Sequence, residues 1–261
     1  MATVVLLPPS EGKAPGGAGA PWETAPTAFP GLAGDRATVR DAVRAVLAAG
    51  EGEAAALLGA RGPHLARALD EWDALDEAGT LPAAERYTGV VWGALDPGGL
   101  SPAARRRLRS WVLVPSGLWG LAAAGDPLPA YRLSMGARVP PLGGLAAWWR
   151  PRVTPLVAAR AGSGWIIDML PAAHRAAIDP DALGPARLLR IDLMTGGAGG
   201  PRAMGHGGKA MKGALARALL EAGARDPASV ARLDVPGLRL DARLRDGRGG
   251  PVTLVFAPGG A

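Results

Sequence analysis

The sequence contains no cysteine, which excludes disulfides, thiolate nucleophiles, iron–sulfur clusters and zinc sites built on sulfur. It has only three histidines, His64, His174 and His206, which lie far apart and lack the spacing of metal ligands. We therefore expect these histidines to be surface or capping residues, and we expect no metal site and no cofactor. Because a reducing cytoplasm fits the missing cysteine, the expected location is cytoplasmic.

Long apolar runs are missing as well. No stretch approaches the roughly 18 consecutive apolar residues of a membrane helix, and no basic segment precedes the short apolar run near the start. We expect neither a membrane span nor secretion. With 48% apolar and 20% charged residues, the chain has the composition of a globular protein, and its 261 residues fit one domain, 1–261.

Lysine is rare among the basic residues. Only three of the 29 are lysines, namely Lys13, Lys209 and Lys212. If arginine has replaced lysine wherever charge alone matters, the remaining lysines mark positions that need a compact ammonium group. Lys209 and Lys212 are three residues apart, which favours a shared site over the alternative that the three lysines are merely remnants.

Positive charge is concentrated in the second half of the chain. The net charge is +6, and residues 131–261 hold 18 of the 29 basic groups but only 9 of the 23 acidic ones. Concentrated basic charge attracts polyanions, so nucleic acid or a phosphorylated small molecule is the first partner to consider. The alternative is an arginine-rich surface that reflects a GC-rich gene.

The apolar pattern predicts an α+β fold. Short apolar runs at 3–7, 111–117, 165–170 and 186–194 predict buried strands, whereas 35–78 has helical periodicity throughout. Strands and helices do not alternate regularly, which argues against a doubly wound sheet. We expect a single compact domain with a mixed sheet, surrounding helices and a helical subregion at about 35–80.

Several boundaries are also predicted. Ser101 and Pro102 form a typical helix start, and Gly223 a typical helix end. A helix at 144–161 is expected to be interrupted near Pro151 and Pro155. The remaining expectations are a turn at 195–201, a short helix at 227–233 and a closing hairpin formed by 238–246 and 251–256.

The segment 206–217 is the first candidate site. In a helix beginning near Gly208, Lys209, Lys212 and Arg217 share an arc of about 140°, close to an N-terminus that itself attracts anions. It is not a Walker A loop, because Ala203 stands where the first glycine is needed and alanine follows Lys209. The alternative is a solvated cationic helix face.

The segment 57–69 resembles the hairpin of a helix-hairpin-helix element. Gly59 and Gly62 lie between two helical patterns, where glycines let backbone amides approach a DNA phosphate, and Arg61 would add charge beside them. Contacts of this kind grip the backbone and give little sequence preference. The alternative is a tight corner between two helices.

A third candidate lies at 114–136, a loop-rich stretch that contains Ser116, Tyr131 and Arg132. Stacking of an aromatic ring or a guanidinium group on a base is one use of such residues. The alternative is a structural turn with a buried tyrosine and a salt bridge from Arg132 to Asp126. A serine hydrolase is excluded because Val114 and Leu118 stand where the nucleophile elbow needs glycine.

Blocks along nearly the whole chain resemble the YaaA (peroxide stress) family. The most specific is YRLSMG at 131–136, although Ala130 stands where the family has proline. ERYTGVVWGAL at 85–95 resembles a family strand, and WIIDMLPAAHR at 165–175 another, with Asp168 and Pro171 in place of asparagine and serine. The other blocks are PPSEGK at 8–13, PSGLWGL at 115–121 and HGGKAMKG at 206–213.

The resemblance implies an α+β domain of unusual topology with a basic cleft, a helix-hairpin-helix element and affinity for DNA without sequence specificity. The expected function is DNA binding in the peroxide stress response; the alternative is an enzyme that acts on a nucleotide or another anionic small molecule in the same cleft. Lys13 lies just beyond the first strand, where binding groups often gather. The candidate anion-binding residues are Lys13, Arg61, Ser116, Tyr131, Arg132, Lys209, Lys212 and Arg217.

Overall fold

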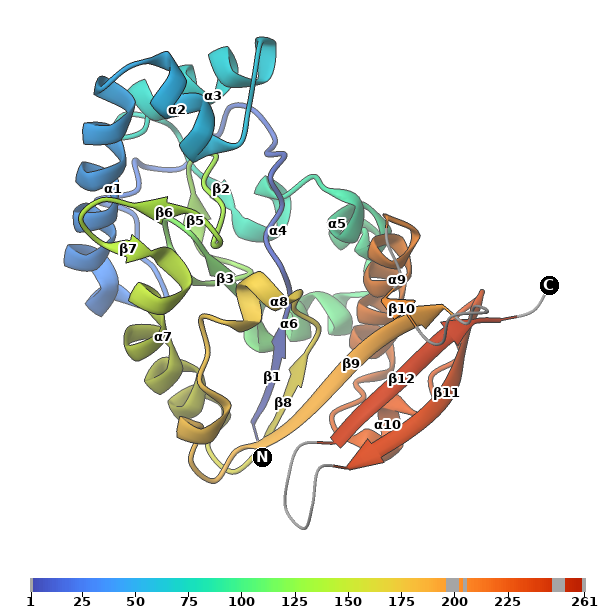
Figure 1. Cartoon of the computed structure of the whole chain (residues 1–261). Helices are drawn as coiled ribbons and strands as arrows, with labels where there is room; N and C mark the ends of the chain where they lie inside the picture. The colour runs from blue at the N-terminus through green and yellow to red at the C-terminus, as the bar shows by residue number, and fades with distance from the viewer. Residues whose placement is uncertain (1, 196–201, 204–205, 246–251, 260–261) are drawn as a thin grey trace.

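One mixed sheet runs through the protein (Figure 1). The computed structural model describes residues 2–195, 202–203, 206–245 and 252–259. The sheet has the strand order β11-β12-β9-β8-β1-β3-β4, and β10 also pairs with β9. Its strands are β1 (Thr3–Leu6), β3 (Val112–Ser116), β4 (Gly120–Ala123), β8 (Trp165–Asp168), β9 (Arg187–Thr195), β10 (Arg202–Ala203), β11 (Leu238–Arg245) and β12 (Val252–Pro258).

The middle of the sheet is parallel and its margins are antiparallel. Strands β12, β9, β8, β1 and β3 run parallel to one another, whereas β11, β4 and β10 pair antiparallel. The expected strands at 3–7, 111–117, 165–170 and 186–194 are confirmed, and so is the pairing of the closing hairpin. The turns expected at 195–201 and around 246–251 fall almost entirely outside the described residues.

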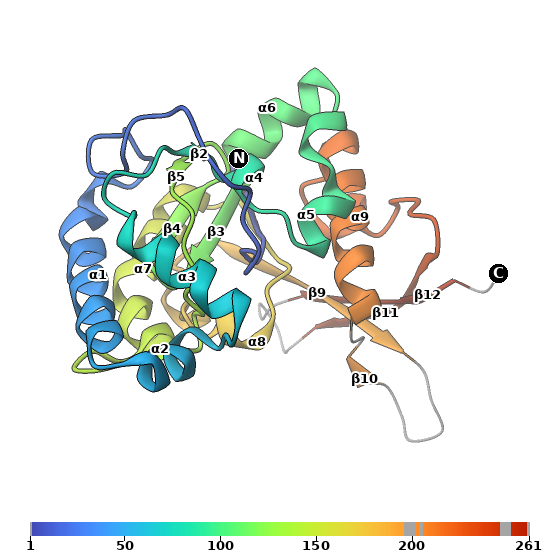
Figure 2. The same ribbon diagram turned by 90° about the horizontal axis from the view of Figure 1, so that it is seen from above.

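Helices cover both faces of the sheet, which explains why its central strands are apolar on both sides. One core contains Val5 and Ile167 and packs against α5 (Val90–Leu95), α6 (Pro102–Trp111) and α9 (His206–Ala222). The other contains Val4 and Ile166 and packs against α1 (Ala33–Ala48) and α7 (Leu145–Ala161). Figure 2 shows these two groups of helices on opposite sides of the strands.

The expected helical subregion is confirmed as α1, α2 (Glu51–Leu58) and α3 (Pro63–Asp73). Ser101 caps α6 as predicted, because its Oγ accepts a hydrogen bond from Ala104 N, and α9 ends before Gly223, whose φ is 66°. The remaining helices are short: α4 (Ala83–Arg86), α8 (Ala172–Arg175), α10 (Pro227–Val230), η1 (Pro30–Leu32), η2 (Pro97–Gly99) and η3 (Pro180–Ala182).

Two expectations were wrong. Helix α7 is continuous, with Pro151 and Pro155 in its interior. Side chains bond to carbonyls beside the two prolines: Thr154 Oγ1 donates to Arg150 O at 2.7 Å, and Arg152 Nη1 donates to Trp148 O at 2.7 Å. The stretch 85–95 contains the end of α4 and all of α5, not a strand, because its apolar run packs as helix against α9.

Two small ladders complete the fold: β2 (Leu81–Pro82) pairs with β5 (Pro127–Leu128), and β6 (Arg138–Val139) pairs with β7 (Gly143–Gly144). No helix in the described part of the chain combines the length and the apolar character that crossing a membrane requires. The mixed sheet with surrounding helices agrees with the expected single α+β domain.

Candidate functional site

The loop that follows β1 is held in place by a buried arginine. Arg86, which is fully buried, donates from Nε to Leu128 O at 2.9 Å and from Nη2 to Gly16 O at 2.7 Å and Gly79 O at 3.0 Å. Lys13 forms an antiparallel bridge with Tyr87 in the same region. These bonds fix a loop that has no regular structure of its own.

That loop directs the Lys13 side chain inward, so that the residue is only 6% exposed. Its Nζ donates to Ser10 O at 2.8 Å and lies 4.5 Å from the ring centre of Tyr131 and 5.8 Å from that of Tyr87. An ammonium group over an aromatic ring is attracted by the ring quadrupole. Lys13 is therefore fixed between carbonyl oxygens and the faces of two phenol rings.

Burial lowers the pKa of Lys13 from 10.5 to about 7. The neighbouring guanidinium groups of Arg132 and Arg86 lower it further, while the carboxylates of Glu71 and Glu11 oppose the change. Near neutral pH the amine is thus divided between its charged and neutral forms. This state is suited both to holding an anion and to exchanging a proton with a ligand.

Ser116 and Tyr131 lie beneath this amine as a hydrogen-bonded pair. Ser116 is the last residue of β3, and its Oγ bonds to the Tyr131 hydroxyl and accepts a hydrogen bond from Trp119 N at 3.2 Å. Both residues are 1% exposed, and burial raises the pKa of Tyr131. At neutral pH the pair consists of two neutral hydroxyl groups.

Arg132 joins this pair to the end of α2. Its Nε donates to Leu58 O at 2.8 Å, and its Nη2 donates to Gly59 O at 3.1 Å and to Glu11 Oε2 at 2.7 Å. The salt bridge to Asp126, which was the structural alternative for Arg132, is not formed; Glu11 is the partner. The buried tyrosine of the same alternative is confirmed.

The corner between α2 and α3 exposes backbone donors. Gly59 and Gly62 have φ values of 57° and 53°, and a Cβ added at either would meet nothing within 4 Å. The amides of Arg61 and Gly62 donate to no acceptor among the described residues, and both residues are exposed. The Arg61 side chain makes no ion pair within the same described part of the chain.

His174 completes the pocket from α8. Its Nδ1 is buried and has no hydrogen-bond partner among the described residues. Burial lowers the pKa of His174 to about 4; the nearby Lys212 lowers it further, and Glu11 opposes this. The imidazole is therefore neutral at physiological pH and has a ring nitrogen available to a ligand.

Helix α9 brings two more lysines near this region. Lys212 is close enough to His174 to influence its pKa, and its own pKa is lowered by burial. Lys209 is exposed one turn earlier. The helix lies close to α5 because Gly213 has no side chain: a Cβ there would be 2.2 Å from Val91 O.

Arg217 lies apart from the other predicted site residues. Its Nη1 donates to Asp96 Oδ2 at 3.0 Å and to Leu95 O at 3.0 Å, and its Nη2 donates to Gly99 O at 2.7 Å. These contacts tie α9 to the segment between α5 and α6. The guanidinium group is thus engaged in joining two helices.

The structure therefore brings together four of the eight predicted residues. Lys13, Ser116, Tyr131 and Arg132 line one cavity of about 50 Å³, which we call the Lys13 pocket. Arg61 lies at the α2–α3 corner, which Arg132 joins to the pocket through Leu58 O and Gly59 O, and Lys212 is close enough to His174 to lower its pKa. The full lining is Pro9, Ser10, Glu11, Lys13, Leu58, Ser116, Tyr131, Arg132, Leu133, Ser134 and His174.

The size of the Lys13 pocket decides what it admits. Since roughly 10–15 Å³ of free space is enough for one water molecule, a cavity of about 50 Å³ has room for a small oxyanion head group. The expectation that a base stacks on Tyr131 is wrong, because Tyr131 is 1% exposed and the Lys13 ammonium lies over its ring.

Two members of the pocket were missed from the sequence. His174 was expected to be a surface or capping residue, because an isolated histidine in a sequence gives no sign of what covers it. Glu11 lies within the SEGK segment that carries Lys13, but its salt-bridge partner Arg132 is 121 residues away, and the sequence gives no sign of that contact.

Comparisons with known proteins point to one family. A family model described as peroxide stress protein YaaA matches residues 3–244. The chain is 39% identical over 220 residues to UPF0246 protein SCO2297 of Streptomyces coelicolor, a match that covers 84% of each chain. It is 33% identical over 266 residues to UPF0246 protein CE1889 of Corynebacterium efficiens, covering 97% of this chain and 99% of the relative.

Proposed function

Since the chain belongs to the peroxide stress protein YaaA family, whose members include UPF0246 proteins, we propose that it acts in this response by binding DNA. The DNA-binding surface in this proposal consists of the α2–α3 corner, the Lys13 pocket and the exposed side of α9. Phosphates are the groups recognised, so binding depends little on base sequence.

The α2–α3 corner is the observation that carries the proposal. The amides of two exposed residues, Arg61 and Gly62, lack acceptors within the described residues, and Arg61 also contributes its guanidinium group. Glycine at both ends leaves the approach open, because no Cβ obstructs an incoming phosphate. Backbone amides and arginine together are the donors that grip nucleic-acid phosphates without reading bases.

Arg132 links this corner to the pocket. It donates to the carbonyl groups of Leu58 and Gly59 on one side and lines the Lys13 pocket on the other. A phosphate at the corner and an oxyanion in the pocket would therefore lie on either side of one guanidinium group. Lys209 and Lys212 would extend the positive surface along α9.

Binding of labelled DNA across a salt series tests the proposal. Three to six phosphate contacts give a slope of about −3 to −5 in log affinity against log salt. The double variant Lys209→Ala/Lys212→Ala should bind duplex, bubble and single-stranded DNA more weakly and with a shallower slope. Arg105→Ala/Arg106→Ala, which removes two exposed charges on α6, is the matched control and should bind like the wild type.

Binding that is nearly independent of salt would rule out the phosphate contacts. Equal losses in the two double variants would also refute the proposal, because affinity would then follow net charge and not a particular surface. Thermal unfolding of each variant checks that the fold is retained.

The enclosed Lys13 pocket favours a second candidate, an enzyme acting on a small anionic molecule. An amine with a pKa near 7 beside a hydroxyl pair can act as a base or as a nucleophile toward a carbonyl carbon. The volume of about 50 Å³ restricts the reacting group to a few heavy atoms.

Reductive trapping tests this candidate. Glyoxylate, a small anionic aldehyde, would form an imine with the neutral Lys13 amine by loss of water, and cyanoborohydride would fix it as a secondary amine. Peptide mass mapping at pH 7 should find Lys13 modified faster than the exposed Lys209. Preferential modification of Lys209 would contradict a reactive amine in the pocket.

A further inference from the structure

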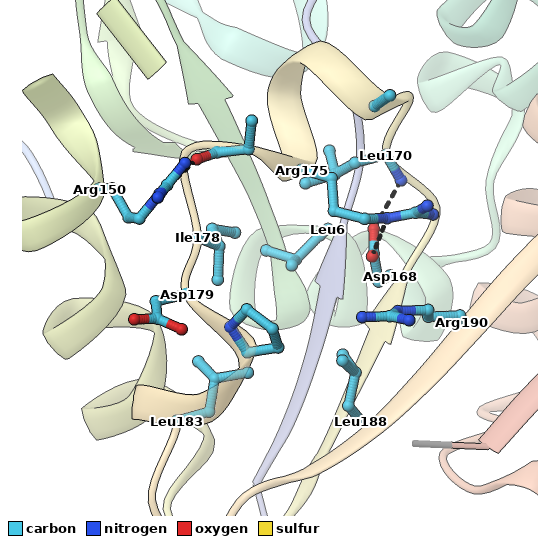
Figure 3. Close-up of a pocket in the computed structure, with 13 residues that line it drawn as sticks. Leu6, Arg150, Asp168, Leu170, Arg175, Ile178, Asp179, Leu183, Leu188 and Arg190 are labelled. Atoms are coloured by element: carbon cyan, nitrogen blue, oxygen red, sulfur yellow. Dashed lines mark hydrogen bonds and ion pairs between the residues drawn. The ribbon is translucent and has the colours of Figure 1, made fainter. Parts of the chain in front are cut away.

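A second, larger cavity lies on the other side of α8. It has a volume of about 430 Å³ and shares no lining residue with the Lys13 pocket. Its walls come from β1, β8 and β9, from α7 and from the segment that runs from α8 to η3 (Figure 3). Helix α8 separates the two cavities, with His174 lining one and Arg175 the other.

The sheet register places the cationic side chain of Arg190 in this cavity. Leu6, Asp168 and Arg190 are direct neighbours across β1, β8 and β9, and all three line it. Arg190 Nε is buried and has no hydrogen-bond partner, and the side chain forms no ion pair with any described residue. Burying such a donor without an acceptor is unfavourable, so the site favours an added anion.

The neighbouring carboxylate does not supply that anion. Asp168 accepts from Leu170 N at 2.8 Å through Oδ1 and from Arg175 Nε at 2.6 Å through Oδ2, so both its oxygens are engaged. Figure 3 shows Arg175 directed at Asp168 while Arg190 extends below it. Asp168 and Asp192 both pair with Arg175, at 2.6 and 3.7 Å, and neither carboxylate forms an ion pair with Arg190.

Two further charged groups lie across the cavity. Arg150 comes from α7, is exposed, and donates through Nε to Ala176 O at 2.7 Å. Asp179 accepts from Asp181 N at 3.1 Å through Oδ1. The lining therefore holds three guanidinium groups and two carboxylates, an excess of one positive charge. Planar guanidinium groups match carboxylate and phosphate oxygens.

The rest of the lining is apolar. Leu6, Leu170, Ile178 and Leu183 are buried core residues, and Leu188 is half-buried beside them. A volume of about 430 Å³ falls within the range of ligand pockets, roughly 300–1,000 Å³, which are mostly apolar with a few placed polar groups. A bare inorganic ion would leave most of this apolar wall uncovered.

We propose that this cavity, which we call the Arg190 pocket, binds a small amphipathic anion. Arg190 bonds the carboxylate or phosphate head group of the ligand, with Arg150 available to a second oxygen at the opening. The apolar or aromatic body of the ligand lies against the leucines and Ile178. This site shares no lining residue with the Lys13 pocket, and its occupancy does not depend on the proposed DNA binding.

Titration with the fluorescent probe 8-anilinonaphthalene-1-sulfonate tests the proposal, because the probe combines an anionic head with an aromatic body. Arg190→Gln should weaken probe binding roughly tenfold or more, since a charge-assisted hydrogen bond is lost. Arg106→Gln, on the exposed side of α6, is the control and should bind like the wild type.

A second variant controls for the possibility that Arg190→Gln loses probe binding by unfolding. Ala172 is exposed and lines the cavity, so Ala172→Trp should block the opening without altering the core, and it should also weaken probe binding. Competition then separates the ligand sources: displacement by decanoate indicates a carboxylate ligand, and displacement by AMP indicates a phosphate ester. Displacement by neither would overturn the proposed ligand class.

Two other outcomes would refute the site itself. If Arg190→Gln and Arg106→Gln weaken binding equally, the probe follows net charge. If folded Ala172→Trp binds the probe as tightly as the wild type, the probe lies elsewhere on the protein.

Discussion

Replacing Lys13 by methionine should change how stability depends on pH. In the folded protein the pKa of Lys13 is lowered to about 7, whereas in the unfolded chain it returns to 10.5. Between these values the unfolded state binds one more proton than the folded state, so stability rises with pH. Below about pH 7 the Lys13 ammonium is charged in both states. The pH dependence from this group then ends, and the full cost of burying the charge remains.

The size of the effect follows from the same difference. One extra proton in the unfolded state gives a slope of about 1.4 kcal/mol per pH unit. Between about pH 7.5 and about pH 9, the free energy of unfolding of the wild type should therefore gain about 2 kcal/mol relative to Lys13→Met. Other groups titrate in both proteins, so the difference between the two curves isolates Lys13.

Urea unfolding at a series of pH values measures this difference. Lys209→Met removes an exposed ammonium group from the surface and should keep the wild-type slope. Parallel curves for the wild type and Lys13→Met would refute the reasoning, because they would mean that the Lys13 ammonium is as well solvated in the folded state as in the unfolded one.

Three substitutions probe the surroundings of the site. Arg217→Gln should lower the free energy of unfolding by about 1 kcal/mol, because it removes hydrogen bonds to Asp96 and nearby carbonyls. DNA affinity should stay unchanged in an anisotropy titration, and weaker binding would contradict this. Gly213→Ala should cost about 1–3 kcal/mol in urea unfolding, because the added Cβ meets Val91 O at 2.2 Å, and an unchanged midpoint would argue against the close packing of α9. Arg132→Lys keeps the charge but cannot hold the same carbonyl groups in a planar fork, so proteolysis at the α2–α3 corner should be faster than in the wild type; an unchanged cleavage rate would show that Arg132 does not hold this corner.

The central strands could be predicted because they are buried on both faces. Runs such as TVVL in β1 and WIID in β8 lack a solvent-exposed polar face, so a short apolar run identifies them. The run VVWGAL at 90–95 looks the same in sequence but forms α5. A run of this length is too short for periodicity to separate helix from strand, and contact with α9 decides between them.

The site was predictable in part for similar reasons. Lys13 and Ser116 each follow or end a parallel strand, and such strand ends meet at one edge of a sheet. Arg217 was grouped with Lys209 because helical spacing predicts only the direction in which each side chain leaves the helix axis. Its partner, Asp96, lies more than a hundred residues away, and helical spacing carries no information about that contact.

The salt dependence of DNA binding by Arg61→Gln is the most direct test of the proposed function. If Arg61 contacts one phosphate, the substitution should weaken binding alike for different sequences and reduce the slope of log affinity against log salt by about one unit. An unchanged slope and affinity, in a variant that unfolds at the wild-type temperature, would contradict the role of the α2–α3 corner.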